Sequence, residues 1–209
     1  MGVGKGRKVR ADKKQEVQPW LSIELRNCIH RLSFITGEAV KNVGEAICVS
    51  GICNKKVISY LSQNFKRDIR IDNTLYFGDL NRISVKKRAA AGLNKPISIR
   101  FNSQTYELIS VLAFALDCTP SLACALLLDA SVRDVDFVND FVESHLKKNI
   151  DEKQMSELKK VLKYVNANNP YEETISWARL LSYMVSEAKV GVDKVQDTVT
   201  DFIVNNWKK

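Results

Sequence analysis

The sequence has little of what several protein classes require. No run of apolar residues approaches the roughly 18 that a membrane-spanning helix needs. Residues 1–16 are basic and lack the apolar stretch of a secretory signal, so the sequence predicts a cytoplasmic protein. The 5 cysteines are an odd number and too sparse for a disulfide scaffold, which agrees with a reducing compartment.

Residues typical of catalysis or metal binding are also scarce. Only 2 histidines occur, and neither His30 nor His145 lies in a recognisable nucleophile, metal-hydrolase or phosphate-loop motif. Cys48 and Cys53 are five positions apart and would point to different sides of a helix, whereas structural zinc pairs lie two to four residues apart. We therefore expect no enzyme activity, no metal site and no cofactor.

Positive charge is present, and it is uneven. The net charge is +8, with 20 Lys and Arg against 11 Asp and Glu in residues 1–132, and 12 against 13 in residues 133–209. This distribution predicts an anionic partner, most simply nucleic acid, for the N-terminal two-thirds. Residues 1–18 are predicted to form a flexible basic arm. Its candidate phosphate-binding side chains are Lys5, Arg7, Lys8 and Arg10.

Two short segments, 19–25 and 96–101, alternate apolar and polar residues as a half-buried strand does. The apolar residues are Leu21, Ile23 and Leu25 in the first segment, and Ile97, Ile99 and Phe101 in the second. The polar residues on the opposite face are Ser22, Glu24 and Arg26, and Ser98, Arg100 and Asn102. A short strand with one apolar face is not stable alone, so each must pair and pack on helices.

Each predicted strand precedes two helical segments joined by a turn, at Gly37 in the first copy and at Asp117 in the second. Thr119 followed by Pro120 is a favoured helix start, with Thr119 as the cap. The interval from Phe101 to Asp117 is 16 residues, against 12 from Leu25 to Gly37, which predicts an insertion in the second copy.

The predicted fold is mainly α with short strands, in tandem strand–helix–helix motifs followed by a C-terminal helical module. The expected divisions are the arm at 1–18, the first copy at 19–65, a basic linker at 66–94, the second copy at 95–133 and the helical module at 134–209. A small hairpin turning at Asp72 and Asn73 is predicted inside the linker. The alternative interpretation of the two predicted strands is that they are ordinary edge strands of an α+β domain.

The order strand, helix, turn, helix resembles the ribbon-helix-helix family of DNA-binding proteins. The resemblance implies that two strands pair into an antiparallel ribbon that enters the major groove. The implied base-facing residues are Ser22, Glu24, Arg26, Ser98, Arg100 and Asn102. Of these, Arg100 suits guanine and Asn102 suits adenine. The start of the second helix, at Thr119 and Ser121, is implied to bind phosphate.

The predicted function is therefore sequence-specific binding of double-stranded DNA by a cytoplasmic, nucleoid-associated transcriptional regulator, with no membrane partner. The alternatives are a plasmid partition or DNA-transfer accessory protein, and a helical interaction scaffold for RNA or acidic protein. The sequence leaves open whether the two strands pair within one chain or between two. A homodimer would form through ribbon pairing or through the C-terminal helices.

Overall fold

The computed structural model describes residues 14–88, 94–145, 151–167 and 169–173. The predicted phosphate-binding residues of the arm, Lys5, Arg7, Lys8 and Arg10, and most of the region predicted as a C-terminal helical module lie outside the described residues. The chain divides into two compact units. Unit 1 has the bounds Met1–Ile29 and Ala39–Ser131, and unit 2 has the bounds His30–Glu38 and Val132–Lys209.

The described residues are mainly helical, with short antiparallel strand pairs, which confirms the prediction of a mainly α fold with short strands. The strands are β1 (Gln15–Val17), β2 (Trp20–Ser22), β3 (Ile69–Ile71), β4 (Thr74–Tyr76), β5 (Asn94–Pro96) and β6 (Ile99–Phe101). The helices are α1 (Ile23–Thr36), α2 (Val40–Cys53), α3 (Lys55–Ser62), α4 (Val85–Arg88), α5 (Ser103–Leu116), α6 (Pro120–Val132), α7 (Val135–His145) and α8 (Glu152–Asn166).

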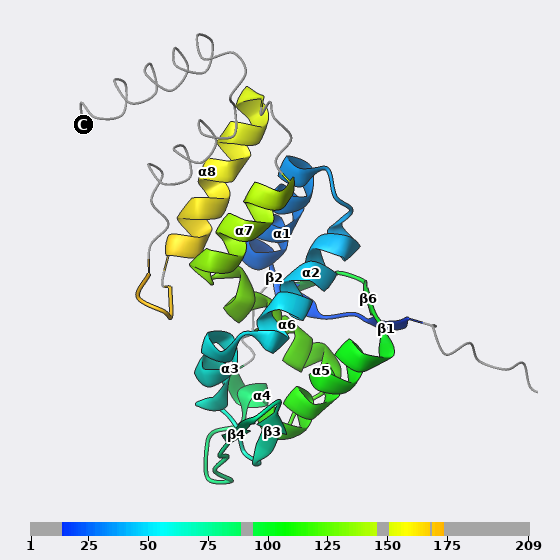
Figure 1. Ribbon diagram of the computed structural model, residues 1–209, viewed down its shortest axis with the longest axis vertical. Coiled ribbons are helices and arrows are strands. Elements are labelled where there is room, and N and C mark those ends of the chain that lie inside the picture. The colour runs from blue at the N-terminus through cyan, green and yellow to red at the C-terminus, as the bar shows by residue number, and fades with distance from the viewer. Residues whose placement is uncertain (1–13, 89–93, 146–150, 168, 174–209) are drawn as a thin grey trace, which may run out of the picture. The chain divides into compact units, whose positions relative to one another are not determined.

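The two strand regions pair with each other inside one chain. β1 pairs antiparallel with β6, so that Gln15 lies opposite Phe101 and Val17 opposite Ile99. β2 pairs antiparallel with β5, so that Trp20 lies opposite Pro96 and Ser22 opposite Asn94. The two numbers of every pair add to 116, so both pairings share one register. Between these two pairings, the amide nitrogen of Ile97 donates to the carbonyl oxygen of Pro19, 3.2 Å away. Residues 15–22 and 94–101 thus form one ribbon, whose β1 and β6 lie side by side in Figure 1.

The ribbon leads into two helix pairs of matching length. α1 and α5 each hold 14 residues and begin 80 positions apart, at Ile23 and Ser103. α2 and α6 also begin 80 positions apart, at Val40 and Pro120. The predicted insertion in the second copy is therefore wrong. It arose because the prediction took Leu25 as the end of a strand, whereas Leu25 lies inside α1.

The first strand of the ribbon starts and ends earlier in the sequence than predicted: it covers residues 15–22, whereas the predicted strand covered 19–25. Helix α1 starts at Ile23 because the hydroxyl of Ser22 accepts a hydrogen bond from the amide of Leu25, at 3.2 Å. Leu25, Cys28, Ile29 and Leu32 are all buried at helical spacing, which favours a helix over a longer strand. Glu24 and Arg26 consequently lie on a helix, and their predicted place on the ribbon is wrong.

The core of unit 1 lies under the inner face of the ribbon. Its ribbon side chains are Val17, Leu21, Ile97, Ile99 and Phe101, all buried. Helix α2 crosses this face at Gly44, where an added Cβ would lie 2.7 Å from the Ile99 Cδ1 atom. The same helix meets α6 at Gly51, opposite Ser131. Glycine at these positions lets the helix approach closely, so the ribbon and both helices form one packed core.

The segment between the copies carries its own small structure. β3 and β4 pair antiparallel on either side of Asp72 and Asn73, where the sequence predicted a hairpin turn. Asp72 has a φ of 50°, a left-handed conformation that Asp tolerates better than most residues. The amide of Lys66 donates to the carbonyl of Ala115 at 2.7 Å, which anchors this segment to α5.

Unit 2 contains α7, α8 and the second half of α1. Asp151 caps α8 in a reciprocal capping box with Gln154. Arg31 on α1 pairs with Glu157 on α8, with 2.9 Å between its Nε and the carboxylate oxygen. The side-chain amide of Gln154 donates to the carbonyl of Ile35 at 3.2 Å. These contacts hold α8 against the end of α1 within this unit.

Within the part of the chain that the structure describes, no single helix is long and apolar enough to cross a membrane. α5 and α6 meet the criteria of length and composition only as a pair, and they are bent by 96° where they join.

Candidate nucleic-acid interface

The ribbon has an outward face opposite its buried face. Alternation along each strand directs every second side chain outward, and the eight positions concerned are exposed. The outward face comprises Glu16, Gln18, Trp20 and Ser22 from the first strand, and Asn94, Pro96, Ser98 and Arg100 from the second. Ser22, Ser98 and Arg100 were predicted to lie here. The structure brings them together with five residues that the sequence analysis did not select.

Glu16 is the centre of a hydrogen-bond network on the outward face. Its Oε1 atom accepts from the side-chain amide of Gln18 and from the hydroxyl of Ser98, both at 2.8 Å. Its Oε2 atom lies 3.5 Å from a guanidinium nitrogen of Arg100. The hydrogen bonds from Gln18 and Ser98, and then the charge of Arg100, lower the pKa of the Glu16 carboxyl from its ordinary value. The network therefore links both strands while Glu16 is ionised.

The sequence contains a signal for the missed residues. Val17, Pro19 and Leu21 are buried and alternate with the exposed Glu16, Gln18 and Trp20. The predicted strand starts at Pro19 and therefore does not include Glu16 and Gln18, the first two residues of the outward face. Trp20 is 62% exposed, although tryptophan is usually well covered in a folded domain. An exposed tryptophan beside polar groups is typical of a binding surface.

Asn102 is the third predicted base-facing residue, after Glu24 and Arg26, that lies off the paired strands. Its side-chain oxygen accepts from the amide of Thr105 at 2.7 Å and caps α5. It is the counterpart, 80 positions on, of Ser22, which caps α1. Asparagine and serine are both favoured caps because they accept from an otherwise unpaired helix amide. Both side chains thus end a strand and start a helix.

The predicted helix start at Thr119 and Pro120 is present. The hydroxyl oxygen of Thr119 accepts from the amide of Leu122 at 3.3 Å, and α6 begins at Pro120. The hydroxyl of Ser121 donates to the carbonyl of Gln18 at 2.6 Å, which holds the start of α6 against the middle of the ribbon. Ser121 thus lies beside the ribbon backbone, while the predicted contact of Thr119 and Ser121 with phosphate stays a prediction.

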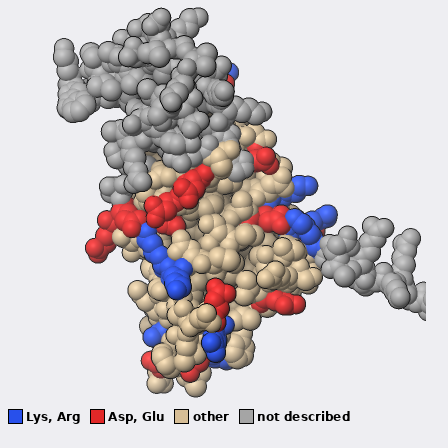
Figure 2. All heavy atoms as spheres, in the orientation of Figure 1, with Lys and Arg blue, Asp and Glu red and all other residues tan. Residues whose placement is uncertain are grey.

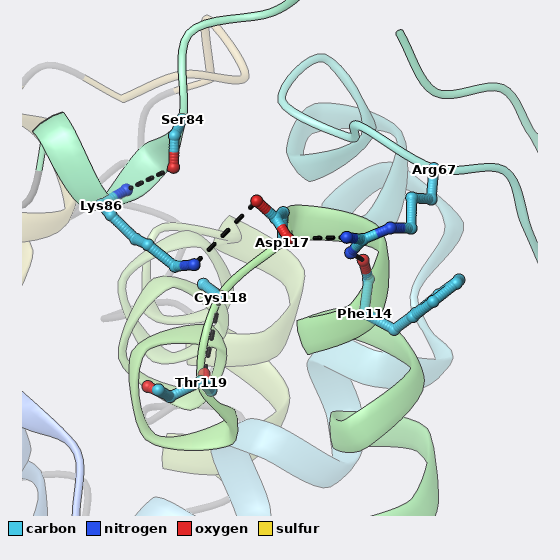
Figure 3. Close-up of polar contacts among 7 residues, drawn as sticks. All are labelled: Arg67, Ser84, Lys86, Phe114, Asp117, Cys118 and Thr119. Atoms are coloured by element: carbon cyan, nitrogen blue, oxygen red, sulfur yellow. Dashed lines mark hydrogen bonds and ion pairs between the residues drawn. The ribbon is translucent and has the colours of Figure 1, made fainter. Parts of the chain in front are cut away.

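Basic side chains gather at the turn before α6, as Figure 3 shows. The Arg67 guanidinium lies 2.8 Å from the Asp117 carboxylate, donates to the carbonyl of Phe114 at 2.8 Å and covers the Phe114 ring at 4.7 Å. Lys86 approaches the other carboxylate oxygen of Asp117 at 4.0 Å. Asp117 has a φ of 54°, so this turn combines a left-handed residue with an ion-pair cluster. The cluster fixes the inter-copy segment next to the start of α6.

Asp117 gives this cluster a pH dependence. Its hydrogen bond from Arg67, followed by the charge of Lys86, lowers the pKa of Asp117 below its ordinary 3.8. A carboxyl with a lowered folded pKa stabilises the fold above the unfolded pKa, and this contribution is lost as the pH falls through the folded pKa. We therefore expect Asp117→Asn to melt at a lower temperature than wild type near neutral pH, and the difference to shrink below about pH 4.

Thermal melting followed by circular dichroism at about pH 6 and about pH 3 measures this difference. Glu107→Gln, which removes an exposed carboxylate elsewhere on α5, is the matched control and should melt at nearly the wild-type temperature near neutral pH. A difference between Asp117→Asn and wild type that is equally large at both pH values would contradict the role assigned to the ion pair.

On the molecular face drawn in Figure 2, basic and acidic side chains are interspersed. Positive charge on this face therefore comes from separate side chains and not from a single continuous patch. At the start of the ribbon, the ammonium nitrogen of Lys14 lies 2.6 Å from a carboxylate oxygen of Glu45 on α2. The arm cations proposed to reach phosphate belong to residues 1–13, outside the described part.

The cysteines behave as core residues more than as reactive groups. Cys28, Cys48 and Cys124 are buried, and the Cys48 and Cys124 sulfurs lie 3.7 Å apart between α2 and α6. Burial raises the pKa of Cys118 to about 11. Cys53 is exposed. Among the described residues, no group of three or more His, Cys, Asp or Glu side chains is placed to hold a metal ion.

No protein-family model, curated protein or solved structure matches the chain. The ribbon, its outward side chains and the start of α6 beside it are the features of the described residues that bear on function.

Proposed function

We propose that this chain is a sequence-specific double-stranded DNA-binding protein that inserts its two-stranded ribbon into the major groove. In this proposal the chain is a tandem ribbon-helix-helix protein, with residues 15–53 and 94–132 as the two copies. The observation that carries the proposal is the single-register ribbon with a buried apolar face and an exposed polar face. The B-DNA major groove is wide enough to admit a two-stranded ribbon.

The outward face has chemistry suited to base edges. A guanidinium such as that of Arg100 donates two hydrogen bonds to O6 and N7 of guanine, and Gln18 carries the amide that pairs with adenine. Ser98 is short enough to contact either bases or phosphate. The start of α6 would bind a backbone phosphate through its exposed amides, since Ser121 holds it beside the ribbon.

Basic residues outside the ribbon would supply affinity without sequence preference. Lys5, Arg7, Lys8 and Arg10 would neutralise phosphates and release counterions, and Lys86 lies next to the start of α6. The proposed role is transcriptional regulation without a cofactor. Each strand already has its partner in the same chain, so a dimer would form through another surface, such as the C-terminal residues.

Selection of bound duplexes from a random pool tests the proposal. We expect a recovered sequence motif and an affinity that falls steeply as salt rises, because phosphate contacts release counterions. Arg100→Ala should lower discrimination at one position by about 1–3 kcal/mol, whereas Lys8→Ala should weaken all duplexes alike and reduce the salt slope by about 1.

Absent or salt-insensitive duplex binding would contradict the proposal. An interaction scaffold would then be the better hypothesis. Exposed apolar side chains between the copies would be its first candidate surface, and they are Leu75, Phe77, Leu80 and Ile83.

A further inference from the structure

The ribbon has approximate twofold symmetry in its backbone. The shared register places Gln18 opposite Ser98, since 18 and 98 also add to 116. The helix bounds relate the copies by 80 positions, which makes the same two residues equivalent. A pseudo-twofold axis therefore passes between Gln18 and Ser98.

The same twofold axis relates the helices α2 and α6. Gly51 on α2 and Ser131 on α6 are 80 positions apart, and they meet directly, because a Cβ on Gly51 would lie 1.8 Å from the Ser131 hydroxyl oxygen. Equivalent residues contact each other only where a twofold axis passes between them. The ribbon and the helix pair thus share one axis inside unit 1.

The side chains on the outward face break this symmetry. On one side of the axis Glu16 faces Arg100, and on the other side Trp20 faces Pro96. The 80-residue relation makes Glu16 equivalent to Pro96 and Trp20 equivalent to Arg100. Each end of the ribbon therefore presents a different chemistry, which we name the charged end (Glu16 and Arg100) and the apolar end (Trp20 and Pro96).

The charged end complements a G·C base pair. Arg100 has 64% of its side chain exposed and Glu16 has 39%, with 3.5 Å between the guanidinium and the carboxylate. A guanidinium donates to guanine O6 and N7, and a carboxylate accepts from the cytosine N4 amino group. Gln18 and Ser98 both donate to the Oε1 atom of Glu16, so the Oε2 atom, which lies 3.5 Å from Arg100, retains a lone pair that can accept from cytosine.

The apolar end complements the thymine methyl group. Trp20 and Pro96 are exposed and offer no charge, and Trp20 is 62% exposed. Apolar side chains distinguish A·T from G·C in the major groove by contact with the thymine C5-methyl. A homodimer built from two identical strands would place the same residues at both ends, and it would then favour a palindrome.

We propose that this chain recognises a non-palindromic duplex, with a G·C-preferring half under the charged end and an A·T-preferring half under the apolar end. The inference rests on the proposed function, because it assumes that the ribbon enters the major groove. It adds the class of DNA target. Fusion of the two copies in one chain allows each end to specify its own half-site.

Selection from a random duplex pool with the full chain separates the two claims. A motif whose halves differ in base composition supports both the function and the asymmetry. A palindromic motif would leave DNA binding standing and overturn the asymmetry. Recovery of no motif would overturn the proposed function itself.

Three defined duplexes give a second measurement: the selected site, and two palindromes made by repeating either half. We expect the selected site to bind about tenfold or more tightly than each palindrome, the size typical of a mismatched base pair. Equal affinity for the selected site and either palindrome would contradict the inference.

Matched variants test which end of the ribbon recognises which half of the DNA site. Arg100→Gln should lose preference in the G·C half and keep it in the A·T half, whereas Trp20→Ala should do the reverse. Both residues are exposed, so neither change removes core packing. A loss of preference in both halves with either variant would show that the two ends do not act separately.

Discussion

Gly51→Ala is expected to lower the free energy of unfolding by about 3 kcal/mol, a large effect for the addition of one methyl group. The new Cβ would lie 1.8 Å from the Ser131 hydroxyl oxygen and 2.7 Å from the Ser131 Cβ. Rotation of the hydroxyl relieves the first contact and leaves the second, which is shorter than real Cβ contacts allow. The helices α2 and α6 must therefore separate where they cross.

Denaturant unfolding of wild type and variant measures this change. The double variant Gly51→Ala with Ser131→Gly is the matched control, because it removes both clashing atoms of Ser131. It should recover most of the lost stability, apart from the 2.6 Å hydrogen bond from the Ser131 hydroxyl to the Leu127 carbonyl. If Ser131→Gly gives no recovery, the crossing point of the two helices is not where the structure places it.

Phe101→Ala is expected to cost about 3–5 kcal/mol of unfolding free energy, while Arg100→Ala on the next position costs less than about 0.5 kcal/mol. Phe101 is fully buried on the inner face of the ribbon, whereas 64% of the Arg100 side chain is exposed. Adjacent strand residues point to opposite faces, so the two variants truncate side chains on opposite faces of the ribbon.

Thermal or denaturant unfolding of both variants tests the register of the ribbon. A slip of one residue would exchange the two faces and reverse the order of the two effects. Leu21→Ala and Trp20→Ala form the matched pair on the first strand, since Leu21 is 1% exposed and Trp20 is 62% exposed. Comparable losses within either pair would contradict the assigned faces.

Local features of the sequence anticipated several elements correctly. Thr119 followed by Pro120 marks the start of α6. Asp72 and Asn73 mark the hairpin turn. Each of these depends on side chains within a few residues of one another, which is the range over which caps, turns and helix periodicity act.

The end of the first strand was not predicted correctly, because the residues from Ser22 to Leu25 fit two patterns. They alternate as a strand does, yet Leu25, Cys28, Ile29 and Leu32 also repeat as a buried helix face does. The cap at Ser22 and burial of this face decide in favour of the helix. Glu24 and Arg26 were assigned to the ribbon for this reason, and Glu16, Gln18 and Trp20 were missed.

The sequence by itself determined a mainly helical protein with two alternating strands and positive charge concentrated in its first two-thirds. Only the tertiary structure decided that the strands pair with each other in one chain, and which eight side chains share the outward face. The physical reason is range. Alternation and caps are local, whereas the register joins residues as far apart as Gln15 and Phe101, and close helix crossing at Gly51 depends on Ser131.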